Sequence, residues 1–242
     1  MNRLDLIAYA IKYQGAYDKI YQAIKNKEGI EHYQNIEALT ILDTNYPKSL
    51  LDLSNPPFVL FYKGDISLIN KDIIGIVGSR LASEYGKKTT NYIVSRIQSK
   101  YVVVSGLAKG IDAMAHESSI KNGSTIGVLG CGINYIYPKS NENLYQIMKK
   151  DHLIISEYPD LVSPMKHHFP FRNRIISALA KKLIVIEAKN NSGTLITVNE
   201  SLTLNRDIYV VPHNIDSENG SGCNKLIQEG ANILLTDDID FL

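Results

Sequence analysis

The sequence lacks the features that define several large protein classes. It has no run of 18 apolar residues, and its N-terminus has no positive region followed by an apolar core, so we expect neither a membrane span nor a secretory signal. Cys131 and Cys223 are its two cysteines. Two cysteines are too few for a disulfide framework and have no zinc-like spacing. These absences predict a cytoplasmic protein with free thiols and no metal.

The signatures of common enzymes are also missing. The chain contains no HExxH, no GxSxG and no Walker P-loop, and no paired acids with evident acid/base roles. The dinucleotide fingerprint GxGxxG is absent, because Gly75 and Gly78 have the wrong spacing and no ribose-binding acid follows the second strand of the expected sheet. We therefore expect no catalytic residues and no cofactor.

Carboxylates are absent from residues 161–186, although the whole chain carries a net charge of only +1. The cations of this range are Lys166, Arg172, Arg174, Lys181 and Lys182. Apolar periodicity predicts a helix starting near Asn173, and cations at a helix N-terminus oppose its dipole unless an external anion binds there. Phe169 and Phe171 are interleaved with the charges, which suits a single-stranded nucleic acid. A solvated basic loop with two core phenylalanines is the alternative.

The order of apolar runs predicts an α/β fold. Residues 2–26 have the pattern of two short helices, and a third is expected around 36–42. An apolar run at 58–62 predicts a buried strand, and from residue 71 short β-rich runs alternate with helical patterns. This alternation is typical of a Rossmann-like, doubly wound, mostly parallel sheet. We assign 1–42 to a short N-terminal helical region and 43–242 to the Rossmann-like domain. The further strands are expected at 73–77, 101–105, 125–129, 153–156, 182–187, 207–211 and 233–235, and the helices between them at 83–99, 110–122, 141–148, 174–180, 194–204 and 223–229.

Ligands of such sheets bind beyond the carboxyl ends of the strands, and glycines and cations gather there in this sequence. Gly78-Ser79-Arg80 follows the first of these strands, Gly106 to Lys109 the second, and Ser192-Gly193-Thr194 the fifth. Together with the basic segment Lys166–Arg174 they predict a glycine-lined anion pocket. Taken singly, an ordinary surface lysine at position 109 and a plain N-cap at Ser192 explain those residues equally well.

Two further groups near these loops resemble catalytic residues without completing a site. Cys131 follows the third strand, but no base is evident beside it, so a small buried residue at a tight turn is the favoured interpretation. His167 and His168 have no visible carboxylate partner. The sequence therefore predicts a binding site without chemistry.

The motifs of residues 40–236 resemble those of the DprA/Smf family, the DNA-processing proteins of bacterial natural transformation. Phe171 departs from the small residue expected between Pro170 and Arg172. The motifs that carry the resemblance are Tyr46-Pro47 with Asn55-Pro56-Pro57, Gly75 to Arg80, Val104 to Ala113, Ala115-His116, Gly130-Cys131-Gly132 with Tyr137-Pro138, Ser156 to Pro159, Phe169 to Ile176, Glu187-Ala188, Ser192-Gly193-Thr194 and Gly222-Cys223-Asn224.

The resemblance implies a protein that binds single-stranded DNA, protects it, loads the RecA recombinase onto it during natural transformation, and forms a homodimer. The N-terminal region is short for the family's sterile-alpha-motif-like domain, and a C-terminal winged-helix-like domain is not expected. Carried over by motif, the DNA contacts are Gly78, Ser79, Arg80, Gly106, Lys109, Lys166, Phe169, Arg172, Asn173 and Arg174, with Ser192, Gly193 and Thr194 nearby.

Two other functions fit parts of the pattern. The lysine-decarboxylase-like nucleotide phosphoribohydrolases have a similar fold and a Gly-Thr turn, but Ile196 and Thr197 stand where their carboxylates are expected. A nucleotide sensor would use the same phosphate pocket without chemistry. Release of free base would favour the first alternative, and tight binding of mononucleotides the second.

Overall fold

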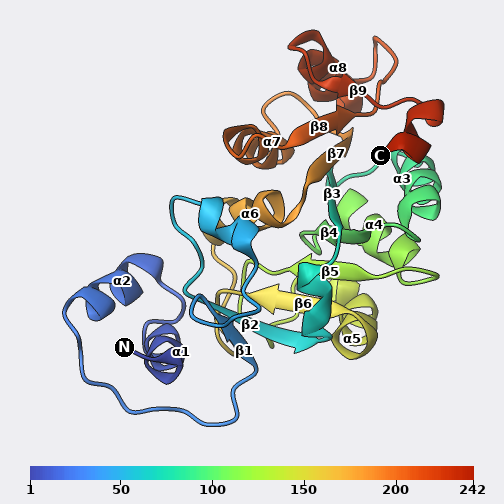
Figure 1. Ribbon diagram of the computed structural model, residues 1–242. Coiled ribbons are helices and arrows are strands. Elements are labelled where there is room, and N and C mark those ends of the chain that lie inside the picture. Colours follow the sequence, from blue (N-terminus) through green and yellow to red (C-terminus); the bar gives the residue numbers. More distant parts are fainter.

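A nine-stranded sheet forms the centre of the protein (Figure 1). The structure is a computed structural model that describes residues 1–242, apart from the side chain of Phe241. Across the sheet the strands follow the order β1-β2-β6-β5-β4-β3-β7-β8-β9. Their bounds are β1 Ala38–Thr40, β2 Val59–Gly64, β3 Ile73–Gly78, β4 Val102–Ser105, β5 Thr125–Val128, β6 Leu153–Ser156, β7 Lys182–Glu187, β8 Asp207–Val210 and β9 Asn232–Ile233.

Seven strands, from β6 to β9 across the sheet, run parallel to one another. At one edge, β2 is antiparallel to both of its neighbours, β6 and β1. The central strands are buried along their whole length, as β4 and β5 show. Continuous burial is expected when helices cover both faces of a parallel sheet. The Rossmann-like fold predicted from the sequence is therefore confirmed.

Helices cover the two faces of the sheet. On one face α6, α7 and α8 pack over Val77, Val104 and Val185. On the other, α3 and α4 pack over Ile76 and Ile184, and α5, α1 and α2 pack over the antiparallel end. The helix bounds are α1 Arg3–Lys12, α2 Tyr17–Lys25, α3 Glu84–Ile97, α4 Ile111–Ser119, α5 Glu142–Asp151, α6 His168–Leu179, α7 Thr194–Thr203 and α8 Ser221–Gln228. Within the described residues, none of these helices has the length and hydropathy needed to cross a bilayer.

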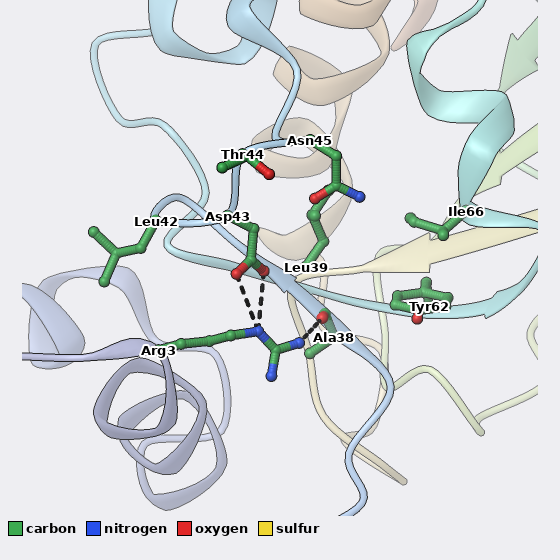
Figure 2. Close-up of a pocket in the computed structure, with 9 residues that line it drawn as sticks. All are labelled: Arg3, Ala38, Leu39, Leu42, Asp43, Thr44, Asn45, Tyr62 and Ile66. Atoms are coloured by element: carbon green, nitrogen blue, oxygen red, sulfur yellow. Dashed lines mark hydrogen bonds and ion pairs between the residues drawn. The ribbon is translucent and has the colours of Figure 1, made fainter.

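The two N-terminal helices attach to the sheet through a polar contact and a close backbone approach. Figure 2 shows the guanidinium of Arg3 on α1 bonded to both carboxylate oxygens of Asp43, with Nε 3.1 Å from each, and to the carbonyl of Ala38 on β1. The pair lies in an open cleft of about 380 Å³. Gly15, between the helices, has a φ of +75° and a Cβ there would lie 2.6 Å from the carbonyl oxygen of Glu157. These contacts hold the helices against the edge of the sheet.

Two elements differ from the prediction. Residues around 36–42 do not form a third helix, because Ala38–Thr40 pairs with β2 as strand β1. The first strand of the sheet thus lies inside 1–42, the range assigned to the helical region. Helix α6 begins at His168 rather than near Asn173, so most of the predicted basic loop is the first two turns of a helix.

The strand order places a topological switch point between β3 and β7. From β3 the chain proceeds through β4, β5 and β6 on one side, whereas β7, β8 and β9 extend the sheet on the other. In open α/β sheets the ligand crevice lies beyond the carboxyl ends of the strands at such a point. The loops after β3 and β7 flank this point, and the loops after β4 and β5 lie at the same edge of the sheet.

A fully buried histidine in the core predicts that the folded protein loses stability at low pH. His116 on α4 is fully buried, and its Nδ1 lies 2.6 Å from the Thr125 hydroxyl, which itself donates to the carbonyl of Val103. Nδ1 must therefore carry the proton, and Nε2 has no partner in the described part of the chain. Burial lowers the pKa of His116 from its ordinary 6.5 to about 3.

Because the folded-state pKa of His116 is depressed, its contribution to stability is fully present above about pH 6.5 and is lost progressively as the pH falls toward 3. We expect the free energy of unfolding from urea titrations to fall between pH 7 and pH 4.5 by about 2 kcal/mol more in the wild type than in His116→Gln. Equal losses in the two proteins would contradict this assignment.

Candidate functional site

The loops that follow β3, β4 and β5 enclose a small cavity against the N-terminal end of α6. Its volume is about 70 Å³. Five of the predicted site residues line it, and no carboxylate does so among the residues that the structure describes. The complete lining is Arg80, Gly106, Leu107, Ala108, Lys109, Leu129, Gly130, Cys131, Tyr137, Pro138, Phe169 and Arg172.

The backbone around Arg80 is fixed by its neighbours, whereas its side chain is exposed. The carbonyl of Ser79 accepts the Ile111 amide at 3.0 Å, and the Ser79 hydroxyl accepts the Leu81 amide at 3.1 Å. Gly110 has a φ of +76°, and a Cβ there would lie 2.2 Å from the Ser79 carbonyl oxygen. Only glycine accommodates both conditions. The turn between β3 and α3 is therefore rigid and presents Arg80 to the cavity.

Two cations and two aromatic rings lie at the accessible surface of the cavity. The side chains of Arg80 and Lys109 are exposed, and neither makes a hydrogen bond or ion pair in the part of the chain that is described. The Arg80 guanidinium lies 5.4 Å from the centre of the Phe169 ring. The centre of the same Phe169 ring lies 5.7 Å from the centre of the Tyr137 ring. Phe169 is half-buried because it packs on Gly130, where a Cβ would lie 2.9 Å from the ring.

Arg172 lines the cavity but uses its guanidinium inside the protein. It is 4% exposed, and Nη1 donates to the carbonyl of Gly106 at 2.6 Å and to that of Val128. Burial lowers its pKa to about 10, while the nearby Asp112 carboxylate acts in the opposite direction. Arg172 remains protonated at neutral pH and ties the ends of β4 and β5 to α6. This arrangement differs from the exposed phosphate clamp predicted for it.

Arg174 does not line the cavity. It is 5% exposed and its Nη2 lies 2.6 Å from Oε1 of Glu157, which is also buried. Its guanidinium stacks 3.9 Å from the centre of the Phe171 ring. Burial raises the pKa of the Glu157 carboxyl, and the Arg174 charge opposes that rise. Arg174 thus forms a buried ion pair between α6 and the end of β6, and the structure gives it no route to a ligand in the cavity.

The remaining predicted residues lie around the cavity or beyond it. Lys166 is exposed two residues before α6, and Asn173 is half-buried and accepts the Nε–H of Arg172 at 3.1 Å. Ser192, Gly193 and Thr194 form the start of α7 and do not line the cavity. Gly78 and Ser79 form the turn that carries Arg80. The structure therefore gathers Arg80, Lys109 and Phe169 and separates them from Arg174 and the α7 turn.

Sequence reasoning missed two contributors to the site. Tyr137 is 43% exposed and stands beside Phe169. Asp112 lies in the first turn of α4 and its Oδ2 accepts the Gly106 amide at 3.2 Å. An acidic residue in the first turn of a helix is favourable beside the positive end of the helix dipole. The position of Asp112 at the start of a predicted helix could therefore have indicated its role. Nothing in the sequence marked Tyr137 beyond its place in a motif.

Cys131 does not have the properties of a nucleophile. Its side chain is buried and its thiol donates to the carbonyl oxygen of Tyr135 at 3.3 Å. Burial raises the pKa of the thiol to about 11, so it stays protonated at neutral pH. No group of three side chains suited to hold a metal ion occurs within the described residues.

The fold and the site define a Rossmann-like protein with a cationic, partly aromatic cavity at the carboxyl edge of its sheet. Residues 37–241 match the model of the family described as DNA recombination-mediator protein A. The chain is 41% identical over 205 residues to DNA processing protein DprA of Streptococcus pneumoniae, covering 84% of this chain and 73% of that one. It is 45% identical over 201 residues to DprA of Bacillus subtilis, covering 82% and 68%. The chain belongs to the DNA recombination-mediator protein A family.

Solved structures agree with this assignment. The X-ray structure of DprA from Streptococcus pneumoniae superimposes with a TM-score of 0.83 at 35% identity, covering 98% of this chain and 92% of that one. DprA from Helicobacter pylori superimposes with a TM-score of 0.78 at 28% identity, covering 86% and 96%. The latter structure is described as giving insight into a unique single-stranded DNA binding mode. The resemblance inferred from the sequence is thus confirmed.

Proposed function

We propose that the protein binds single-stranded DNA at the cavity between Arg80, Lys109 and Phe169, without catalysing a reaction on it. The observation that carries the proposal is the pairing of two exposed cations with an aromatic ring in a cavity whose described lining contains no carboxylate. Phosphates attract the cations whatever the sequence, and bases stack on aromatic rings. A single strand offers both groups at once, whereas a duplex hides the faces of its bases.

The proposal extends to the role that the family resemblance implies. The protein would protect incoming single strands in the cytoplasm and load a RecA-type recombinase onto them during natural transformation, acting as a homodimer. Support comes from the family's description as recombination mediators and from the DprA relatives. The buried, protonated thiol of Cys131 supports a role without nucleophilic chemistry.

We expect oligo-dT to bind more tightly than a duplex of equal length and to lose affinity steeply with salt. Stacking on Phe169 and Tyr137 requires unpaired bases, while the salt dependence reports the released counterions. Fluorescence anisotropy with labelled oligonucleotides at two salt concentrations measures both effects. Equal affinity for duplex and single strand, or tight binding of mononucleotides with no preference for oligonucleotides, would contradict the proposal.

A further inference from the structure

The N-terminus of α3 is occupied by a carboxylate of the protein itself. Glu187, at the end of β7, is fully buried, and its Oε2 accepts the amide of Ser83, the N-cap of α3, at 3.0 Å. Gly86 in the first turn makes room for it, since a Cβ there would lie 2.8 Å from Oε2. The Ser83 hydroxyl accepts the Gly86 amide at 3.0 Å. The carboxylate and the cap together satisfy amides that a phosphate binds in other Rossmann-like proteins.

The second carboxylate oxygen of Glu187 indicates that the side chain does more than cap the helix. Oε1 of Glu187 is buried and has no hydrogen-bond partner within the described residues. A buried carboxylate oxygen without a donor is costly in free energy. The dipole of α3 offsets part of that cost, because a negative charge is stabilised beside a helix N-terminus. Glu187 thus stands where an external anion would otherwise bind, at the switch point between β3 and β7.

Glu187 also completes the fixation of the turn that carries Arg80. The turn begins at Gly78 on β3, is held in the middle where the Ser79 carbonyl accepts the Ile111 amide, and is held at its end where Ser83 donates to Glu187. Ser83 is three residues from Arg80. If the last bond is lost, the turn keeps its anchor at Ser79 but loses the one at Ser83, and the position of Arg80 beside Phe169 becomes less strictly fixed.

We propose that Glu187 is an internal anion that fills the phosphate position of α3 and thereby positions Arg80 for the nucleic acid. The phosphate backbone is consequently directed to the side chains of Arg80 and Lys109 rather than to the amides of α3. This inference rests on the proposed function. It assigns Glu187 a positioning role, because its side chain does not line the cavity.

Three variants test the proposal. Glu187→Ala removes the anion, Glu187→Gln keeps an oxygen that accepts the Ser83 amide, and Thr90→Ala removes a buried hydroxyl bond to Gly86 within the same helix but away from the turn. Labelled oligo-dT is titrated by anisotropy at fixed ionic strength, with sodium chloride or sodium acetate as the salt. Melting temperatures are recorded under both conditions, because acetate is a small carboxylate that fits the space left by the glutamate side chain.

We expect Glu187→Ala to bind oligo-dT about tenfold more weakly in chloride, the loss of one charge-assisted contact. Acetate should restore a large part of the affinity and raise the melting temperature of this variant alone. Glu187→Gln keeps an acceptor for the Ser83 amide but not the negative charge, so it should bind about threefold more weakly than the wild type, and Thr90→Ala should lose stability without losing affinity. If Glu187→Ala does not fold, Glu187→Gln decides: wild-type affinity in that variant overturns the proposal.

The proposal is also overturned if Glu187→Ala binds as tightly as the wild type, or if acetate leaves both its affinity and its melting temperature unchanged. These outcomes differ from a failure of the proposed function, which is seen when the wild type does not bind oligo-dT. In that case the acetate effect on the melting temperature of Glu187→Ala still tests whether Glu187 fills an anion position.

Discussion

Replacing Arg80 with alanine is expected to weaken binding of oligo-dT and of mixed-sequence oligonucleotides by the same factor, about tenfold to a hundredfold at moderate salt. The Arg80 side chain is exposed at the cavity and makes no hydrogen bond or ion pair to described residues, so its donors are available to a ligand. A phosphate contact carries no sequence information, which is why the loss should be uniform. The dependence of log affinity on log salt should fall by about one unit.

Lys121→Ala is the matched control for Arg80→Ala. Lys121 is exposed just beyond the C-terminal end of α4, so this variant removes the same charge at the opposite edge of the sheet. It should bind oligonucleotides as the wild type does, apart from the small change caused by net charge. If Arg80→Ala binds single strands as tightly as the wild type at moderate salt, the cavity is not the DNA site.

Most of the sheet could be predicted because parallel strands leave a strong signal. The predicted strand 73–77 corresponds to β3, and 182–187 to β7 without any shift. Strands buried on both faces form continuous β-branched runs, and turns with glycine end them. Strand β1 has only three residues, too few to show a period of two, and this is why the pattern around 36–42 predicts a helix instead. Its partner β2, rather than its own sequence, makes it a strand.

The start of α6 was misplaced for a physical reason. Pro170 lies in the first turn, where its missing amide hydrogen has no intrahelical partner to lose. Proline usually interrupts a helix, so Phe169-Pro170-Phe171 predicts a loop, but in the first turn the proline is tolerated and the segment is helical. In a helix, residues three apart share a face. Phe169 and Arg172 consequently face the cavity, whereas Phe171 and Arg174 face away from it.

The burial of the two arginines could not be predicted from residues 161–186. That segment contains no carboxylate, so the sequence predicts that its cations are free to bind an external anion. The partners come from other segments: Glu157 precedes it and pairs with Arg174, and Asp112 lies on α4 beside Arg172. Arg80 and Lys109, which are exposed at the cavity, lie at the carboxyl edge of the sheet as predicted, because the loops that follow parallel strands all lie at that edge.

The ion pair between Glu157 and Arg174 supports a prediction about stability rather than binding. Each partner is less than 10% exposed, and the two atoms of the pair lie 2.6 Å apart. Removing one partner leaves the other charge buried without compensation, which costs about 3–5 kcal/mol. We therefore expect Arg174→Met and Glu157→Leu each to lower the free energy of unfolding in urea by this amount.

The double variant should be much less destabilised than the sum of the two single variants, because it leaves no uncompensated charge and fills the space with apolar groups. Below its urea transition, each folded variant should bind oligo-dT as the wild type does, since Arg174 does not line the cavity. Additive single effects would show that the two residues are not coupled. A loss of oligo-dT affinity with unchanged stability would instead return Arg174 to the DNA-binding surface on which the sequence had placed it, and would require α6 to turn that side chain toward the ligand.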